Sequence, residues 1–176
     1  MRRCVSAMRM RAVVPVPVLS ARRLCTATPT QTYPHTVELQ TRWGDNDIFG
    51  HVNNVVFYAF MDDAVNNYLI AHGVTQRRFV AQSNCRYVRP LAYPQPVEVG
   101  LGIAALGRSS VTYSMGIFSR PAPSVLTGTA TSEQREFCAE GTFVHVFVDD
   151  ETGRPTPMSE HTRAALSSLV FDAAPS

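Results

Sequence analysis

The feature that most constrains the fold is one long helical pattern that is followed only by strand patterns. Between residues 55 and 69, apolar side chains recur at the spacing of one helix face. They are Tyr58, Met61, Val65, Tyr68 and Leu69, and the opposite side carries Asp62, Asp63, Asn66 and Asn67. Asn53 and Asn54 are good N-cap residues, so the helix is expected to begin there and to stop at Gly73.

Strand patterns lie on both sides of this helix. Residues 35–43 alternate apolar and polar side chains, which predicts a strand before the helix. After the helix, β-rich runs separated by Pro, Gly or Arg-Ser turns cover residues 78–89, 97–106, 109–118 and 142–149. Residues 119–132 read as a loop, with a strand at 125–130 as the alternative, and residues 159–170 predict a final helix.

This order of elements favours an α+β domain. An antiparallel sheet of consecutive strands can curl around the long helix and bury the apolar helix face. A chain of 176 residues is long enough for one such domain and short for two. A single curled sheet leaves an edge or a face open, which favours a homo-oligomer. No apolar run approaches the roughly 20 residues needed to span a bilayer.

Charge is distributed unevenly along the chain. All 16 basic residues are arginine, and six of them precede the first acidic residue, Glu38. A segment rich in Arg, with Ser and Thr but without acid, has the composition of a mitochondrial transit peptide. We therefore expect residues 1–32 to be a leader that is cleaved within residues 24–31 and directs residues 33–172 to the mitochondrial matrix. A basic tail that stays attached is the alternative.

The part of the chain after the leader is mildly acidic, because ten arginines face 14 acidic residues there. This balance argues against nucleic acid as a partner. The four cysteines, at positions 4, 25, 85 and 138, show no CxxC pair, so neither a zinc site nor a disulfide framework is expected. We expect no metal and no cofactor.

The polar segment between the first strand and the helix is the best candidate for chemistry. Thioester hydrolysis needs a water or a carboxylate at the carbonyl carbon, and a group that holds the charge developing on oxygen. Asp47 lies in the loop just before the helix, whose first N–H groups lack intrahelical partners and carry partial positive charge. The amides around residues 53–55 could therefore polarise the carbonyl, while Gly50 lets the backbone approach the substrate.

Residues 42–54 read Arg-Trp-Gly-Asp-Asn-Asp-Ile-Phe-Gly-His-Val-Asn-Asn, and Tyr58 follows four residues later. This segment resembles the signature of the 4-hydroxybenzoyl-CoA thioesterase-like branch of the hotdog superfamily. The similarity continues through Tyr-Val-Arg-Pro at residues 87–90 and extends over about residues 33–169. It implies a hotdog fold, in which a curled antiparallel sheet of five or six strands wraps around one long central helix.

The resemblance also implies an activity and residue roles. The activity is hydrolysis of a fatty or aromatic acyl-CoA to free acid and CoA. Asp47 would be the general base or nucleophile, Asn54 would supply the polarising amide, and His51 would orient water or protonate the leaving thiolate. Predicted substrate contacts are Gly50, Val52, Tyr58, Arg89 and Arg108. The structural alternatives are a cap for Asn53 or Asn54, a turn former for Asp45, a structural hydrogen bond for His51, and core for Tyr58.

Other functions remain open at this point. An acyl carrier protein could replace CoA, although plant acyl carrier protein thioesterases carry Asn where this chain has Phe49. A non-catalytic hotdog module within a mitochondrial assembly is a second alternative. Hotdog hydratases place four residues between their Asp and His, whereas three separate Asp47 from His51, which disfavours a hydratase. The sequence does not decide between a homodimer and a homotetramer.

Overall fold

The computed structural model describes residues 32–120 and 135–171. The predicted leader up to residue 31, its cleavage region and the alternative strand at residues 125–130 lie outside the described residues. Within the described part, the order of elements is β1 (His35–Gln40), the 3-10 helix η1 (Trp43–Asp45), α1 (Asn54–Ala71), β2 (Arg78–Tyr87), β3 (Pro96–Leu106), β4 (Ser110–Ser119), β5 (Glu136–Phe147) and α2 (Glu160–Ser167).

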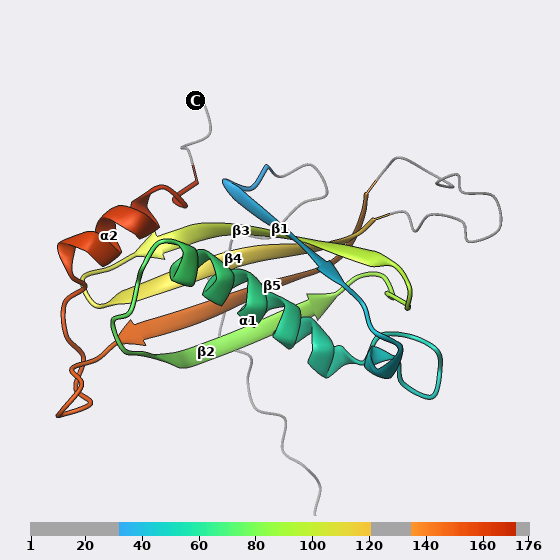
Figure 1. Ribbon diagram of the computed structural model, residues 1–176, viewed down its shortest axis with the longest axis horizontal. Helices are drawn as coiled ribbons and strands as arrows, with labels where there is room; N and C mark the ends of the chain where they lie inside the picture. Colours follow the sequence, from blue (N-terminus) through green and yellow to red (C-terminus); the bar gives the residue numbers. More distant parts are fainter. Residues whose placement is uncertain (1–31, 121–134, 172–176) are drawn as a thin grey trace, which may run out of the picture.

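The five strands form one antiparallel sheet in the order β1-β3-β4-β5-β2, and α1 lies across one face of it (Figure 1). This arrangement confirms the predicted α+β hotdog class. The three strands β3, β4 and β5 follow one another as a meander, with Val97 opposite Ser119 and Ser119 opposite Glu136.

The position of β2 differs from the prediction of consecutive neighbours. β2 does not pair with β3 but lies at the far edge next to β5, with Tyr87 opposite Ala139. The reason is that α1 carries the chain across the sheet face, from the β1 edge to the opposite edge (Figure 1). Strand β5 also begins at Glu136, six residues earlier than predicted, because its first half pairs with both β4 and β2.

The core lies between α1 and the sheet. Buried α1 side chains recur at helical spacing and are Phe57, Phe60, Met61, Ala64, Val65, Tyr68 and Leu69. The predicted apolar face is therefore confirmed except at its first position, where Phe57 is buried and Tyr58 lies half-buried, stacked on Phe143. The helix approaches β5 so closely that a Cβ atom at Gly141 would overlap the Met61 side chain.

Both ends of α1 follow the sequence prediction. The Asn53 side chain is the N-cap and accepts a hydrogen bond from Val55 N at 3.1 Å. At the other end Gly73 has φ +64°, Gly73 N donates to Ile70 O, and Val74 N donates to Leu69 O. This is the glycine-based Schellman ending, which satisfies carbonyls that have no helical partner.

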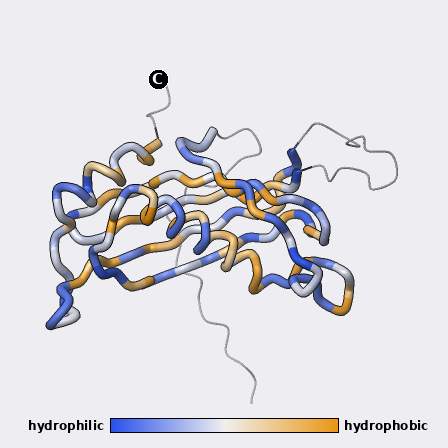
Figure 2. The backbone as a smooth tube through the Cα atoms, viewed as in Figure 1, coloured by the Kyte–Doolittle hydropathy of each residue, from blue (hydrophilic) through white to orange (hydrophobic). Residues whose placement is uncertain are grey.

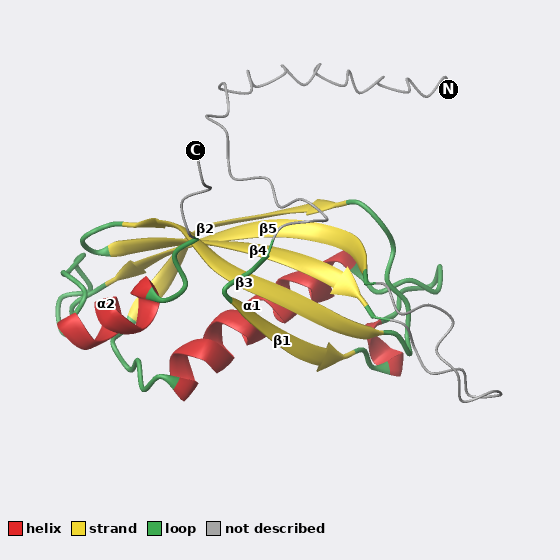
Figure 3. Ribbon diagram, turned by 90° about the horizontal axis from the view of Figure 1, so that it is seen from above, coloured by secondary structure: helices red, strands yellow, loops and turns green. Residues whose placement is uncertain are grey.

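Helix α2 closes the end of the core beside the C-terminal half of α1. Leu166 and Leu169 join the main core cluster, and the Tyr68 hydroxyl donates to Ala165 O at 2.7 Å. Figure 3 shows α2 near this end of α1, away from the helix start. No helix of the described residues is long and apolar enough to cross a membrane.

Candidate active site

The loop between η1 and α1 is closed on itself and fastened to the chain that follows β2. Asp47 N donates to His51 O at 2.8 Å, and Gly50, at φ +79°, donates from its N to Asp47 O at 3.1 Å. Glycine fits this left-handed conformation without steric cost. Val52 N donates to Leu91 O at 2.8 Å, and Tyr93 N donates to the Asn46 side chain at 3.2 Å. These bonds fix Asp47 relative to residues 88–95.

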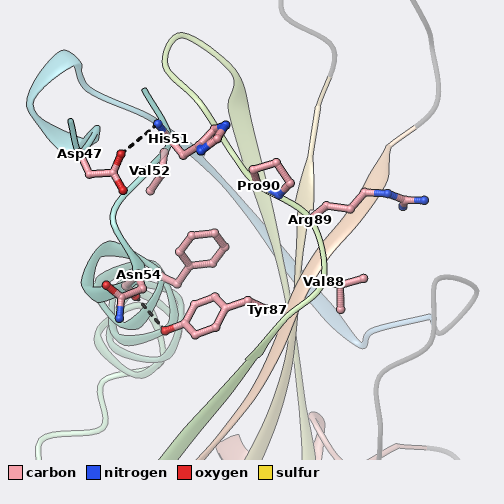
Figure 4. Close-up of a pocket in the computed structure, with 9 residues that line it drawn as sticks. Asp47, His51, Val52, Asn54, Tyr87, Val88, Arg89 and Pro90 are labelled. Carbon is pink, nitrogen blue, oxygen red and sulfur yellow. Dashed lines mark hydrogen bonds between the residues drawn. The ribbon is translucent and has the colours of Figure 1, made fainter. Parts of the chain in front are cut away.

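The two aspartates of this loop have different environments. The Asp45 side chain is buried, accepts a hydrogen bond from Arg42 N at 2.7 Å and pairs with the Arg42 guanidinium at 3.1 Å. Asp45 therefore builds the turn, as its structural reading predicted. Asp47 is half-buried and faces the pocket described below (Figure 4).

The two oxygens of the Asp47 carboxylate are not equivalent. Oδ1 accepts hydrogen bonds from Phe49 N at 2.8 Å and from His51 N at 3.3 Å. Oδ2 accepts none from the described residues. The loop amides thus orient the carboxylate through one oxygen and leave the other oxygen available for a proton or for a carbonyl carbon.

The start of α1 offers a hydrogen-bond donor on the same side. Val55 N is capped by Asn53, and Val56 N donates to Asn53 O at 2.9 Å. Asn54 N has no acceptor among the described residues. A free N–H at the positive end of a helix is a suitable donor for an oxyanion.

Asp47 and Asn54 line one pocket of about 330 Å³. Its other lining residues come from the loop, from the first turn of α1 and from the end of β2 with the chain that follows, and they are His51, Val52, Phe57, Tyr87, Val88, Arg89 and Pro90. Figure 4 shows these groups arranged around one open space between the helix start and the β2 end. Four of the nine lining residues are apolar, and they are Val52, Phe57, Val88 and Pro90.

Tyr87 lines the pocket, although no role was predicted for it from the sequence. Its hydroxyl donates to Asn54 O at 3.0 Å, and its ring packs edge-on against Phe57 at 5.2 Å. Burial of the hydroxyl raises the pKa of Tyr87 to about 12, so the hydroxyl stays protonated and remains a donor at neutral pH. Its position in the Tyr-Val-Arg-Pro stretch was the only signal in the sequence, and that stretch indicated family resemblance rather than a contact.

Five of the predicted site residues line the pocket together: Asp47, His51, Val52, Asn54 and Arg89. The His51 ring is exposed and has no hydrogen-bond partner among the described residues; its link to Asp47 runs through backbone atoms. The Arg89 guanidinium donates to Phe137 O at 3.4 Å and points away from Asp47 (Figure 4).

The remaining three predicted residues do not line the pocket. Gly50 shapes the loop through its positive φ. Tyr58 faces Phe143 on the helix flank rather than the pocket, because a one-residue shift around the helix places Phe57 there instead. Arg108 lies in the β3–β4 turn, where its carbonyl accepts from Met158 N next to α2, at the opposite end of the sheet (Figure 1).

The tip of the loop is hydrophobic and exposed. Ile48 is 94% exposed and Phe49 is 76% exposed, and they form the orange segment before α1 in Figure 2. Trp43, also exposed, packs edge-on against Tyr93 at 5.9 Å. Within residues 32–120 and 135–171 there is no group of three or more His, Cys, Asp or Glu side chains that could hold a metal ion.

Comparison with known proteins agrees with this architecture. A sequence model of the thioesterase-like superfamily matches residues 41–166. The crystal structure of the PA5185 protein from Pseudomonas aeruginosa PAO1 is 44% identical, with a TM-score of 0.69, over 80% of this chain and 94% of that one.

Two further solved structures are similar at lower identity. The PA2801 protein, a putative thioesterase from Pseudomonas aeruginosa, is 27% identical with a TM-score of 0.64, over 76% of this chain and 98% of that one. A thioesterase from Thermus thermophilus, complexed with coenzyme A and Zn, is 29% identical with a TM-score of 0.61, over 78% of this chain and 95% of that one. The family match covers well over half of the sequence and includes the pocket, and on this evidence the chain belongs to the thioesterase-like superfamily.

Proposed function

We propose that this thioesterase acts on acyl-CoA and hydrolyses a fatty or aromatic acyl thioester to the free acid and CoA. The observation that carries the proposal is the joint position of Asp47 and the start of α1 in one pocket. The thioesterase from Thermus thermophilus was crystallised with coenzyme A, which supports CoA as the thiol carrier here.

Asp47 is proposed to act in one of two ways. As a general base, its free Oδ2 takes a proton from water while the water oxygen attacks the thioester carbon; the tetrahedral intermediate then collapses, the C–S bond breaks, and the proton passes from Asp47 to the leaving thiolate or to solvent. As a nucleophile, Oδ2 attacks the carbon itself, the thiolate leaves, and water hydrolyses the resulting anhydride. Both routes release one acid and one thiol for each water consumed.

The Asn54 N–H is proposed to stabilise the negative charge on the carbonyl oxygen in either route. A donor fixed before the reaction begins needs no reorganisation when the charge develops. Tyr87 supports this donor indirectly, since its hydroxyl ties Asn54 O to the end of β2. The apolar walls formed by Val52, Phe57 and Val88 suit the acyl group next to the carbonyl.

Thiol release from purified protein tests the proposed substrate class. The panel contains acyl-CoAs of graded chain length, benzoyl-CoA, and the same acyl groups on acyl carrier protein. We expect saturable thiol release from at least one acyl-CoA, with a lower kcat/KM for the carrier-protein form. Turnover of the carrier-protein thioesters alone would replace CoA by the carrier protein, and no turnover of any thioester would favour a non-catalytic module.

We also propose delivery to the mitochondrial matrix and assembly into a homodimer or homotetramer. The leader composition supports the first proposal, since residues 1–37 carry six arginines and no acid. The full chain with a C-terminal fluorescent tag should reach mitochondria, and replacement of these six arginines by glutamine should abolish import. Cytosolic fluorescence from the unaltered chain would contradict the proposal.

A further inference from the structure

A second hollow, of about 350 Å³, lies beside the later turns of α1 and is lined by polar groups. Asp62 and Asn66 come from α1, Arg78 and Val80 from β2, and His145 from β5; the segment before β2 adds Thr75, Gln76 and Arg77. None of these residues lines the pocket at Asp47. The thioesterase chemistry derived above uses none of them.

His145 is the most unusual group in this hollow. The residue is only 3% exposed, and neither ring nitrogen has a hydrogen-bond partner among the described residues. Its ring packs edge-on against Tyr113 at 5.1 Å, and the buried Tyr113 hydroxyl also makes no hydrogen bond within the described part of the chain. Buried polar groups without partners are costly and rare, so each one calls for an explanation.

Arg78 supplies positive charge next to His145. The half-buried guanidinium donates to Asn66 Oδ1 at 2.7 Å and to Gln76 O at 3.5 Å, but it forms no ion pair with any carboxylate of the described residues. Asp62 lines the same hollow without pairing to it. Arg77 also lines the hollow, but its guanidinium donates to Asp150 O at 3.1 Å and lies over the Phe79 ring at 5.3 Å, so Arg78 is the guanidinium that a ligand in the hollow would meet.

We propose that this hollow binds an oxyanion, a carboxylate or a phosphate, whose oxygens accept hydrogen bonds from the Arg78 guanidinium and from a ring N–H of His145. The planar guanidinium matches the geometry of both groups. Burial, assisted by the charge of Arg78, lowers the pKa of His145 to about 4. The imidazole is therefore neutral at pH 7, and its single N–H is the donor that an oxyanion oxygen would satisfy. The inference does not depend on the proposed thioester substrate.

Titration of the full chain with two separate probes, sodium benzoate and inorganic phosphate, tests the site. NMR signals of the His145 ring and of the Arg78 guanidinium report binding in the hollow directly. We expect saturable shifts of both signals with at least one probe. Loss of one charge-assisted contact in Arg78→Gln should weaken that binding by about tenfold. Arg78→Lys retains the charge and should weaken it less.

Arg154→Gln is the matched control, because Arg154 is exposed and does not line the hollow. The dissociation constant of this variant for each probe should stay within about twofold of the value for the unaltered chain. Loss of one charge-assisted hydrogen bond would change that constant by more. Response to benzoate alone identifies a carboxylate ligand, and response to phosphate alone identifies a phosphate ligand. The proposal is overturned if neither probe shifts His145, or if Arg78→Gln binds as tightly as Arg154→Gln.

Discussion

The two aspartates before α1 lie two positions apart in the sequence but differ in their surroundings and in their proposed roles. Asp45 is buried against Arg42 and shapes the turn, whereas Asp47 is held through Oδ1 and keeps Oδ2 free of protein donors in the described residues. The difference arises because Asp45 is the last residue of η1, while Asp47 begins the loop that leads to the helix. A carboxylate that is oriented by backbone amides is prepared for base or nucleophilic chemistry.

The buried His145 should make the free energy of unfolding depend on pH. Its pKa is lowered to about 4 in the folded protein from an ordinary value of 6.5, chiefly by burial. Between these values the unfolded chain binds a proton that the folded chain does not, so the free energy of unfolding falls as the pH drops from 6.5 to 4. The loss from this one group is about 3 kcal/mol at pH 4.

Urea unfolding at pH 7 and pH 4 measures this effect, in buffers free of phosphate and carboxylates. His145→Gln removes the titration, so its loss of unfolding free energy over this range should be smaller by about 3 kcal/mol. His161→Gln is the control, since His161 is exposed, and this variant should show the same loss as the unaltered chain. Equal losses in all three proteins would contradict the assignment.

At this scale the sequence could predict that Asp47 and Asn54 lie in one pocket, but not all of their surroundings. Both residues lie within one local motif, so their proximity follows from the loop and the helix start. Tyr87 is 33 residues away from Asn54, and their hydrogen bond exists only because β2 ends beside the helix start. Arg108 does not line the pocket, and the sequence could not show this, because a turn residue can lie at either end of a sheet.

At the scale of elements, the packing of α1 against the sheet depends on a glycine, Gly141 of β5. A Cβ atom at Gly141 of β5 would overlap the Met61 side chain and approach the backbone oxygen of Asn84 to 2.7 Å. Met61 can move, but the backbone carbonyl of the paired strand cannot move without loss of β2–β5 pairing. Gly141→Ala should therefore lower the free energy of unfolding by about 1–3 kcal/mol, the usual range for overpacking a core.

Chemical denaturation of Gly141→Ala and of Gly44→Ala measures this difference. Gly44 has no atom within 4 Å of an added Cβ and no positive φ, so its replacement should change stability by less than about 0.5 kcal/mol. Equal stability of the two variants would show that α1 is not packed tightly on β5.

The helix and most strands could be predicted because their signals are local. The helical spacing of apolar residues in α1, its Asn N-cap and the glycine at its C-terminal end all lie within one short stretch of sequence. All three match the structure closely. The strand order could not be predicted in the same way. Pairing of β2 with β5 depends on where α1 delivers the chain, and the longer β5 depends on partners on both sides.

At the scale of the whole molecule, β2 leaves one edge of the sheet open in the described structure. The strand has ten residues, and Phe79 and Val80 are 50% and 52% exposed. A long edge strand with exposed apolar side chains and unpaired backbone groups favours pairing with a second chain. We therefore predict that the protein is a homodimer or a larger assembly through this edge.

Light scattering after size exclusion tests the prediction. In a two-fold pair of β2 strands, Ser83→Lys brings two like charges close together at the middle of the strand. The variant dimer should therefore dissociate at a higher protein concentration than the unaltered dimer. Ser167→Lys, on the exposed surface of α2, should leave the mass unchanged. A monomeric unaltered chain, or equal masses for both variants, would argue against this interface.

The central claim is that Asp47 performs the chemistry of the thioester, and its replacement tests the claim most directly. Asp47→Asn retains the size of the side chain but removes the carboxylate, and kcat for the best acyl-CoA should fall by about 100-fold or more. Asp150→Asn, at an exposed turn outside the pocket, should keep the unaltered rate. Full turnover by Asp47→Asn, with its fold intact by circular dichroism, would contradict the account.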